Sequence, residues 1–163
     1  MSKRSSVRVI VGFAGAFLAG TAGAADVVTT KSFTVVDGNR IAVSGKELRL
    51  DGIVAPDLGR QCVLGGKARD CGAIARAGLL DLTAGATVTC RKAGILDGAP
   101  THRCTADGYD LSECMVYTGW AVPLEGAPKV YWNVLKGARE RPRGFWRGTF
   151  VEPWAEVARI AGD

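Results

Sequence analysis

The sequence predicts a mixed α+β fold, a small five-stranded Greek-key β-barrel of the OB type with three helices. Short β-branched runs separated by Asp-Gly and Ser-Gly turns fill residues 33–57, and such runs are typical of antiparallel strands. A helical segment follows them, and two further strand-like runs come next. Five short strands with an inserted helix favour a barrel.

The first three strands are expected before Pro56, which ends the third. Turns at Asp37-Gly38 and at residues 44–46 separate them, because Asp and Gly tolerate turn conformations that bulkier residues resist. The three expected strands are Phe33–Asp37, Arg40–Val43 and Glu47–Ile53.

The rest of the chain alternates helices and strands. Apolar residues recur at near-helical spacing in the first helix, Gly85 and Gly119 end the first two helices, and Pro142 ends the third. Residues 63–70 and 93–101 are interpreted as a Gly-rich loop and an irregular turn, and the aromatic tail 144–160 is expected to pack on the body. The expected elements are helices at Cys71–Thr83, Leu111–Thr118 and Val130–Arg141, strands at Ala86–Cys90 and His102–Thr105, and an extended segment at Trp120–Leu124.

Residues 1–24 have the pattern of a secretory signal. Three cations precede the apolar run Val9–Leu18, and Ala22-Gly23-Ala24 is a small-x-small cleavage site. The run is short for a membrane anchor, the alternative interpretation. We therefore expect residues 25–163 to form one exported monomeric domain, in the periplasm of a bacterium, with no membrane span after cleavage.

The charge distribution gives a weak indication of an anionic partner. Of 21 Lys and Arg, three lie in the signal, which leaves 18 against 16 Asp and Glu, a net charge of +2. Residues 129–147 hold six cations and one anion. Such a segment either meets phosphates or is a solvated helix face.

Five cysteines in an exported chain indicate disulfides. Cys62 and Cys71 bracket the Gly-rich loop, and Cys90 and Cys104 lie on strands that would be adjacent. We predict these two pairs and leave Cys114 as a buried free thiol, although one sequence does not prove the pairing. A zinc site is disfavoured by the single histidine and the lack of a Cys-x-x-Cys motif.

The motifs over residues 32–154 resemble those of the staphylococcal nuclease (thermonuclease) family. The segments that carry the resemblance are VVDGNRIAV, RLDGIVAPDLG, CGAIARAGLLDLTAG, the run from VTC to RCTADGYDLSECMVYTGWA, and ARERPRGFWRGTF. The resemblance implies a five-stranded OB barrel with three helices. It also implies a site in which Asp carboxylates and a backbone carbonyl hold Ca²⁺, a Glu positions water, and two Arg bind phosphate.

Carried onto this sequence, the family pattern is incomplete. Arg49 matches the first phosphate-binding Arg, and Asp57 stands in place of the Glu, one methylene shorter. The metal set reduces to Asp37, Asn39 and the carbonyl of Ala55. Asn39 replaces an Asp, Arg40 replaces a Thr, and Val54 replaces the other metal-binding Asp. No arginine of the turn before Arg103 matches the second phosphate ligand, and the aromatics expected after the second helix are missing.

These departures predict a degenerate nuclease domain. Metal and arginine contacts to a transition state are each worth about 10²–10³ in rate, so little Ca²⁺-dependent activity is expected. The first hypothesis is a binding or structural module for single-stranded nucleic acid or another extended anion, without a cofactor. The alternative is an active Ca²⁺-dependent phosphodiesterase, acting on DNA or RNA, with altered metal ligands.

Simpler roles for the same residues also stay open. Asp37 suits an Asx turn, Arg49 could pair with Asp57 or Asp37, and Asp57 could cap a loop. His102 is typical of a surface or packed side chain, since no nucleophile accompanies it. The four tryptophans suit packing better than base stacking.

Overall fold

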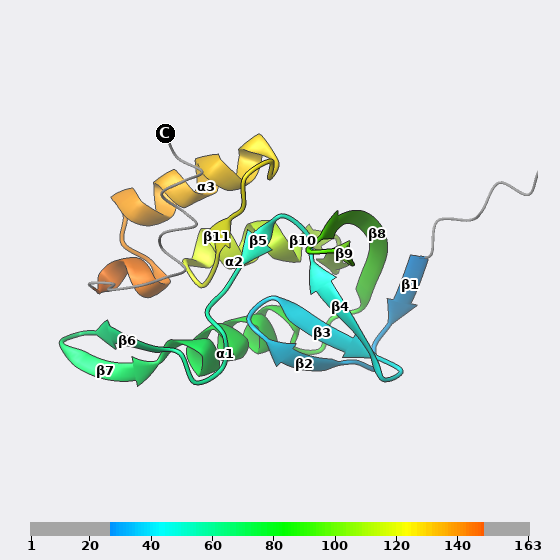
Figure 1. Ribbon diagram of the computed structural model, residues 1–163, viewed down its shortest axis with the longest axis horizontal. Coiled ribbons are helices and arrows are strands. Elements are labelled where there is room, and N and C mark those ends of the chain that lie inside the picture. Colours follow the sequence, from blue (N-terminus) through cyan, green and yellow to red (C-terminus); the bar gives the residue numbers. More distant parts are fainter. Residues whose placement is uncertain (1–26, 149–163) are drawn as a thin grey trace, which may run out of the picture.

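A computed structural model describes residues 27–148. The predicted signal, residues 1–24, and the tail beyond residue 148, including Trp154, lie outside the described residues. Within residues 27–148, no helix is long and apolar enough to cross a membrane. The elements, in chain order, are β1 (Val27–Thr30), β2 (Thr34–Asp37), β3 (Arg40–Val43), β4 (Lys46–Leu50), β5 (Ile53–Val54), β6 (Gln61–Leu64), β7 (Lys67–Asp70), α1 (Cys71–Thr83), β8 (Val88–Leu96), β9 (Ala99–Ala106), β10 (Tyr109–Asp110), α2 (Leu111–Thr118), β11 (Val122–Pro123), α3 (Lys129–Glu140) and a 3₁₀ turn, Gly144–Arg147 (Figure 1).

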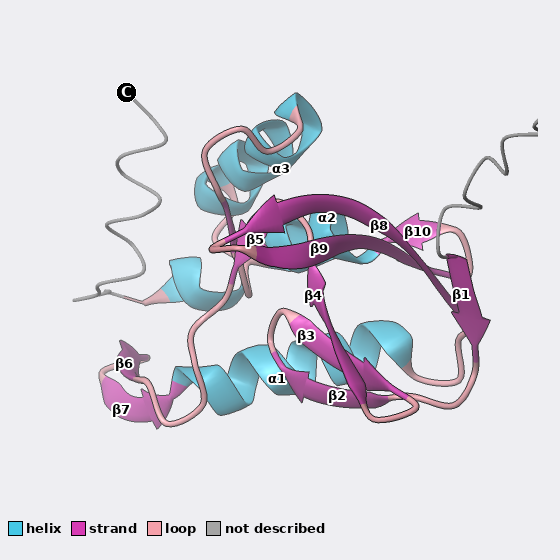
Figure 2. Ribbon diagram, turned by 45° about the vertical axis from the view of Figure 1, so that its right-hand side comes forward, coloured by secondary structure: helices cyan, strands magenta, loops and turns pink. Residues whose placement is uncertain are grey.

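A seven-stranded sheet in the order β1-β8-β9-β4-β3-β2, with β10 beside β9, forms the body of the protein. All of its pairs are antiparallel except β4 with β9, which run parallel. This parallel pair joins the N-terminal meander of β2, β3 and β4 to the long β8–β9 hairpin (Figure 2). The ladders of the described residues form an open path from β1 to β2, without a pairing that closes them into a barrel. With its three helices, this part of the chain is a mixed α+β fold.

The three helices cover the sheet and close the core. Helix α1 lies along β2, and α2 packs against α3 and β9 (Figures 1 and 2). Asp70 and Asp110 cap the first two helices, because their carboxylates accept the backbone N–H groups of Ala73 and Glu113. The largest fully buried side chains are Tyr131, Phe145, Ile41, Leu50, Ile53, Leu79, Leu111 and Met115.

Helix boundaries follow the predictions closely, but several strands differ. Helices α1 and α2 have the predicted limits, and α3 is shifted by one residue. The predicted strand Glu47–Ile53 is divided into β4 and β5, because Gly52 has a φ of 72° and turns the chain between them. Strand β1, which pairs with β8, was not predicted.

Two segments predicted as irregular are hairpins. The Gly-rich segment 63–70 forms most of the β6–β7 hairpin around Gly65-Gly66. The segment 93–101 continues β8 and β9 up to a tight turn at Asp97-Gly98, where both residues have positive φ. A two-residue hairpin loop of this kind needs positive φ at both residues, and an Asp-Gly pair favours it because both residues tolerate such angles. The prediction of an irregular turn was therefore wrong.

Both predicted disulfides are present. Cys90 and Cys104 are direct partners in the β8–β9 ladder, with Cα atoms 4.1 Å apart. Cys62 on β6 is joined to Cys71, the first residue of α1, with Cα atoms 5.8 Å apart. Cys114 is free as predicted, but it is half-buried, not buried, because it lies on a partly exposed side of α2.

Candidate functional site

A cleft of about 420 Å³ brings together most of the residues that the motifs single out. Strands β3 and β4 form one wall, the segment after β5 forms another, and the start of β9 closes it. Four predicted site residues line it: Asn39, Arg49, Ala55 and Asp57. The other lining residues are Arg40, Glu47, Val54, Ala99 and Pro100.

Two arginines face each other across the strands of the cleft. Arg40 on β3 is the antiparallel partner of Arg49 on β4, so the two side chains project from the same face. Like charges directly opposite one another are destabilising unless counter-charges lie nearby. Glu47 accepts a hydrogen bond from Arg40 at 3.3 Å, and Asp97 lies 3.6 Å from a guanidinium nitrogen of Arg49.

Asp37 lies behind this wall and is fully occupied by protein donors. Its side chain is only 3% exposed, and its Oδ2 accepts a hydrogen bond from Nε of Arg40 at 2.6 Å and forms an ion pair with Nη2 of the same guanidinium, also at 2.6 Å. Its Oδ1 accepts the backbone N–H of Asn39 at 2.9 Å, which is an Asx turn. The hydrogen bond to Asp37 is the main cause that raises the pKa of Arg40 above its ordinary value. Asp37 is not among the residues that line the cleft.

The other two metal positions offer only weak ligands. Asn39 is 7% exposed, and its side-chain nitrogen donates to the carbonyl oxygen of Ile53 at 3.5 Å. Val54 has no side-chain oxygen, and Ala55 brings only its backbone carbonyl. A hard cation such as Ca²⁺ needs several oxygens, preferably anionic. With Asp37 neutralised by Arg40, these residues do not fit Ca²⁺.

Within residues 27–148, no group of three or more His, Cys, Asp or Glu side chains could hold a metal ion in place of these ligands.

Two glycines set the walls of the cleft. A Cβ on Gly38 would lie 2.6 Å from the Cβ of Ala75 on α1 and 2.7 Å from that of Ala55. The turn that carries Asp37 and Asn39 therefore packs against the helix only because residue 38 has no side chain. A Cβ on Gly72 would collide with the backbone carbonyl of Asp57, so this glycine lets the start of α1 approach the Asp57 loop.

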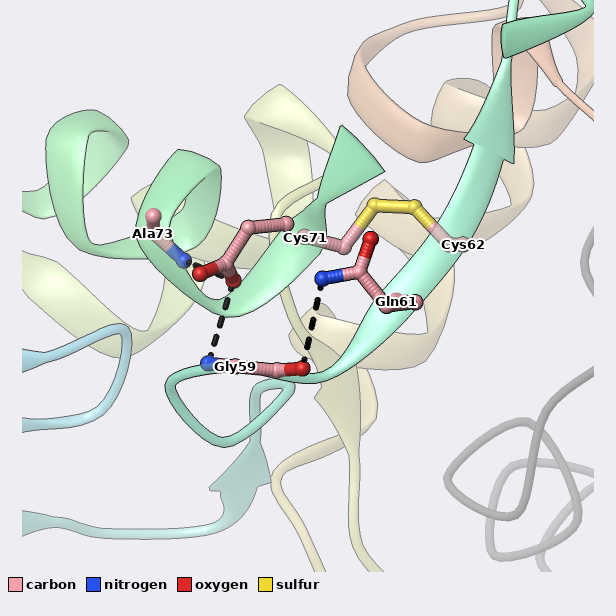
Figure 3. Close-up of a disulfide and its surroundings, with 6 residues drawn as sticks. Gly59, Gln61, Cys62, Cys71 and Ala73 are labelled. Carbon is pink, nitrogen blue, oxygen red and sulfur yellow. Dashed lines mark hydrogen bonds between the residues drawn. A yellow bond between two sulfur atoms is a disulfide. The ribbon is translucent and has the colours of Figure 1, made fainter. Parts of the chain in front are cut away.

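The Cys62–Cys71 disulfide holds the same loop from the other side (Figure 3). The N–H of Gly59 donates to the Asp70 carboxylate that also caps α1, and the N–H of Cys71 donates to the carbonyl of Arg60. The N–H of Arg60 in turn donates to the carbonyl of Asp57 at 3.0 Å. These contacts fix the backbone of the loop while the Asp57 side chain stays exposed to solvent.

The basic segment 129–147 does not face this cleft, and two of its arginines are packing residues. The guanidinium of Arg139 lies 4.5 Å from the ring centre of Trp146, and that of Arg143 lies 3.9 Å from that of Tyr117. Such cation–π contacts fix the 3₁₀ turn against α2 and α3. Trp120 packs on Phe145 in an edge-to-face arrangement, in agreement with a packing role.

The motifs do not indicate the part that Arg40 and Glu47 play. Arg40 stands in them only as the replacement of a Thr, and Glu47 belongs to none of them. The signal that could have found them is register: in a hairpin around residues 44–45, Arg40 faces Arg49, and both need anions nearby. The structure also pairs Arg49 with Asp97 and not with Asp57 or Asp37.

The chain matches no known family model, and no curated protein matches it significantly. Membership of the staphylococcal nuclease family therefore stays a prediction from the motifs quoted above.

Proposed function

We propose that this chain is an exported OB-fold domain of the staphylococcal nuclease type that binds an extended anion in the cleft and has little or no Ca²⁺-dependent nuclease activity. The order of paired strands supports the OB assignment, because a three-stranded meander joins a two-stranded hairpin through one parallel pair. The two disulfides support an oxidising compartment such as the periplasm. A monomeric state is part of the same proposal.

The observation that carries the proposal is the contact of Arg40 with Asp37. The guanidinium occupies a carboxylate that a metal centre would use, and it brings a fixed positive charge to the wall of the cleft. A cation at this place opposes the entry of a second cation. The positive charge that attracts an anion then comes from arginine and not from a metal ion.

Arg49 is the group best placed to bind that anion. Its side chain is 31% exposed, and its counter-charge, Asp97, is 80% exposed and 3.6 Å away. An ion pair so exposed to water is worth about 0–1 kcal/mol, so an incoming phosphate or carboxylate can displace it. Arginine presents a planar pair of donors that suits both groups. Arg40 cannot take this part, because two carboxylates already hold it.

Direct binding measurements test the proposal. Purified protein is titrated with a fluorescent single-stranded oligonucleotide at low salt, with Ca²⁺ or with EDTA. We expect saturable binding that does not require Ca²⁺ and that weakens about tenfold in Arg49→Ala. Lys67→Ala, on the exposed β6–β7 hairpin, is the matched control. Binding that is lost in EDTA, or that is equal in both variants, would contradict the proposal.

A cleavage assay on denatured DNA with Ca²⁺ separates the proposal from the phosphodiesterase alternative. Cleavage by the unmodified protein that Arg49→Ala abolishes would establish the enzyme. The structure also defines the gain-of-function variant. Asn39→Asp with Val54→Asp restores the carboxylates, but Arg40→Thr is needed as well, because the guanidinium would otherwise lie beside the restored ligands.

A further inference from the structure

A second cavity, of about 440 Å³, lies on the opposite face of β4 from the cleft. Successive residues of a strand point to opposite faces, so Lys46 and Leu48 line this cavity while Glu47 and Arg49 line the cleft. Its lining residues are Val28, Val43, Ser44, Lys46, Leu48, Cys90, Lys92, Pro100 and His102. The volume falls within the range of small-molecule sites.

Among the described residues, the charged part of this cavity is basic. Lys46 and Lys92 are its charged lining residues, and no Asp or Glu of residues 27–148 lines it. Lys92 is the direct cross-strand partner of His102, so their side chains lie on the same face of the β8–β9 ladder. An anion placed here meets two ammonium groups.

His102 adds a buried polar atom behind the lining. The residue is 7% exposed, and its Nδ1, itself buried, has no hydrogen-bond partner within the described part of the chain. Buried polar atoms almost always have a partner, because an unpaired one loses its hydration without compensation. Burial is the main cause that lowers the pKa of this imidazole, and Lys46 and Lys92 add to it, so the group is neutral at pH 7.

The remaining wall is apolar except for Ser44. Val28 on β1, Val43 on β3 and Leu48 on β4 line it together with Pro100 and Cys90 of the second disulfide. A fully hydrated inorganic anion would leave this wall without a partner. The apolar wall and the basic rim together match a molecule with a charged head and a short hydrocarbon body.

We propose that this cavity binds a small amphipathic anion, a carboxylate or phosphate on a short apolar chain, with its head at Lys46 and Lys92 beside His102 and its body against Val28, Val43 and Leu48. The site is independent of the proposed function of the cleft, since the two cavities share only Pro100. Carboxylate and phosphate heads have the same requirement for donors and positive charge.

The test uses octanoate and octyl phosphate as probes, with octanol and octyltrimethylammonium as matched neutral and cationic compounds. His102 is the only histidine of the sequence, so its imidazole NMR signals report on the site without ambiguity. We expect at least one of the two anions to bind saturably, to shift the His102 signals and to raise the pKa of the imidazole. Which anion binds more tightly identifies the head group.

Variants decide between a built site and unspecific partition. Lys46→Ala combined with Lys92→Ala is expected to weaken binding of the anion about tenfold or more, while Lys67→Ala leaves it unchanged. His102→Gln, which keeps a polar side chain, tests the contribution of the buried nitrogen. Equal binding of octanol and octanoate, an unchanged affinity in the double variant, or no response at His102 would each overturn the proposal.

Discussion

The contact of Arg40 with Asp37 gives the sharpest test of how the site is built. Arg40→Met removes the guanidinium and keeps an unbranched apolar stem. The buried Oδ2 of Asp37 then loses its hydrogen bond from Nε and its ion pair with Nη2, while Oδ1 keeps the N–H of Asn39. The substitution therefore leaves a partly unsatisfied carboxylate at a position that is 3% exposed.

The magnitude follows from these contacts. A hydrogen bond to a charged group is worth about 1.5–3 kcal/mol, and here one such bond and an ion-pair contact of the same guanidinium reach one oxygen. The Arg40 side chain is 41% exposed, so water replaces part of the loss. We expect the free energy of unfolding to fall by about 2–3 kcal/mol, and Tm by about 3–5 °C for each kcal/mol in a domain of this size.

Urea unfolding at neutral pH, followed by circular dichroism, measures the effect. Glu47→Gln is the matched control, because it removes the other partner of the same arginine, at 3.3 Å and 53% exposed, and should cost less than about 1 kcal/mol. A double-mutant cycle of Arg40→Met with Asp37→Asn isolates the pair. A loss below about 0.5 kcal/mol in Arg40→Met, or a coupling near zero, would refute the view that Arg40 neutralises Asp37.

Three further predictions follow from other contacts. Gly38→Ala should lower the free energy of unfolding by about 1–3 kcal/mol, because the new Cβ would lie 2.6 Å from the Cβ of Ala75. The control variant Gly137→Ala, in α3, should not destabilise the protein. Urea titrations that rank the two variants in the reverse order would contradict this prediction. Replacing Cys62 and Cys71 by Ser should cost about 2–3 kcal/mol and speed amide exchange at residues 57–60, and unchanged exchange there would show that the disulfide does not hold the loop. Burial and then Lys46 and Lys92 lower the pKa of His102, while the backbone of Arg49 and, to a smaller extent, Asp51 oppose them. The lowered pKa means that the unfolded chain binds more protons below about pH 6.5. Stability should therefore fall as pH drops from about 7 to 5, and by less in His102→Gln; equal pH profiles from urea unfolding would contradict the buried neutral imidazole.

The sequence by itself determined the three helices and the turns before residue 47, and it predicted the two disulfides. Apolar spacing and glycine ends gave the limits of α1 and α2, because helix limits depend on local contacts within three or four residues. The pairing of Cys90 with Cys104 followed from the expectation of adjacent strands. The sequence motifs also predicted one site that includes Asn39, Arg49, Ala55 and Asp57, and these residues do line one cleft.

Only the tertiary structure decided the burial of Asp37 and the surroundings of His102. Arg40 lies opposite Asp37 across the tight β2–β3 turn, a local pair, but the turn packs against α1 only because Gly38 has no side chain. His102 is buried beside Lys92 and Lys46 because the parallel pair of β4 with β9 brings two distant segments together. Residue type and spacing do not predict the burial of these side chains, because burial depends on which elements of the chain become neighbours.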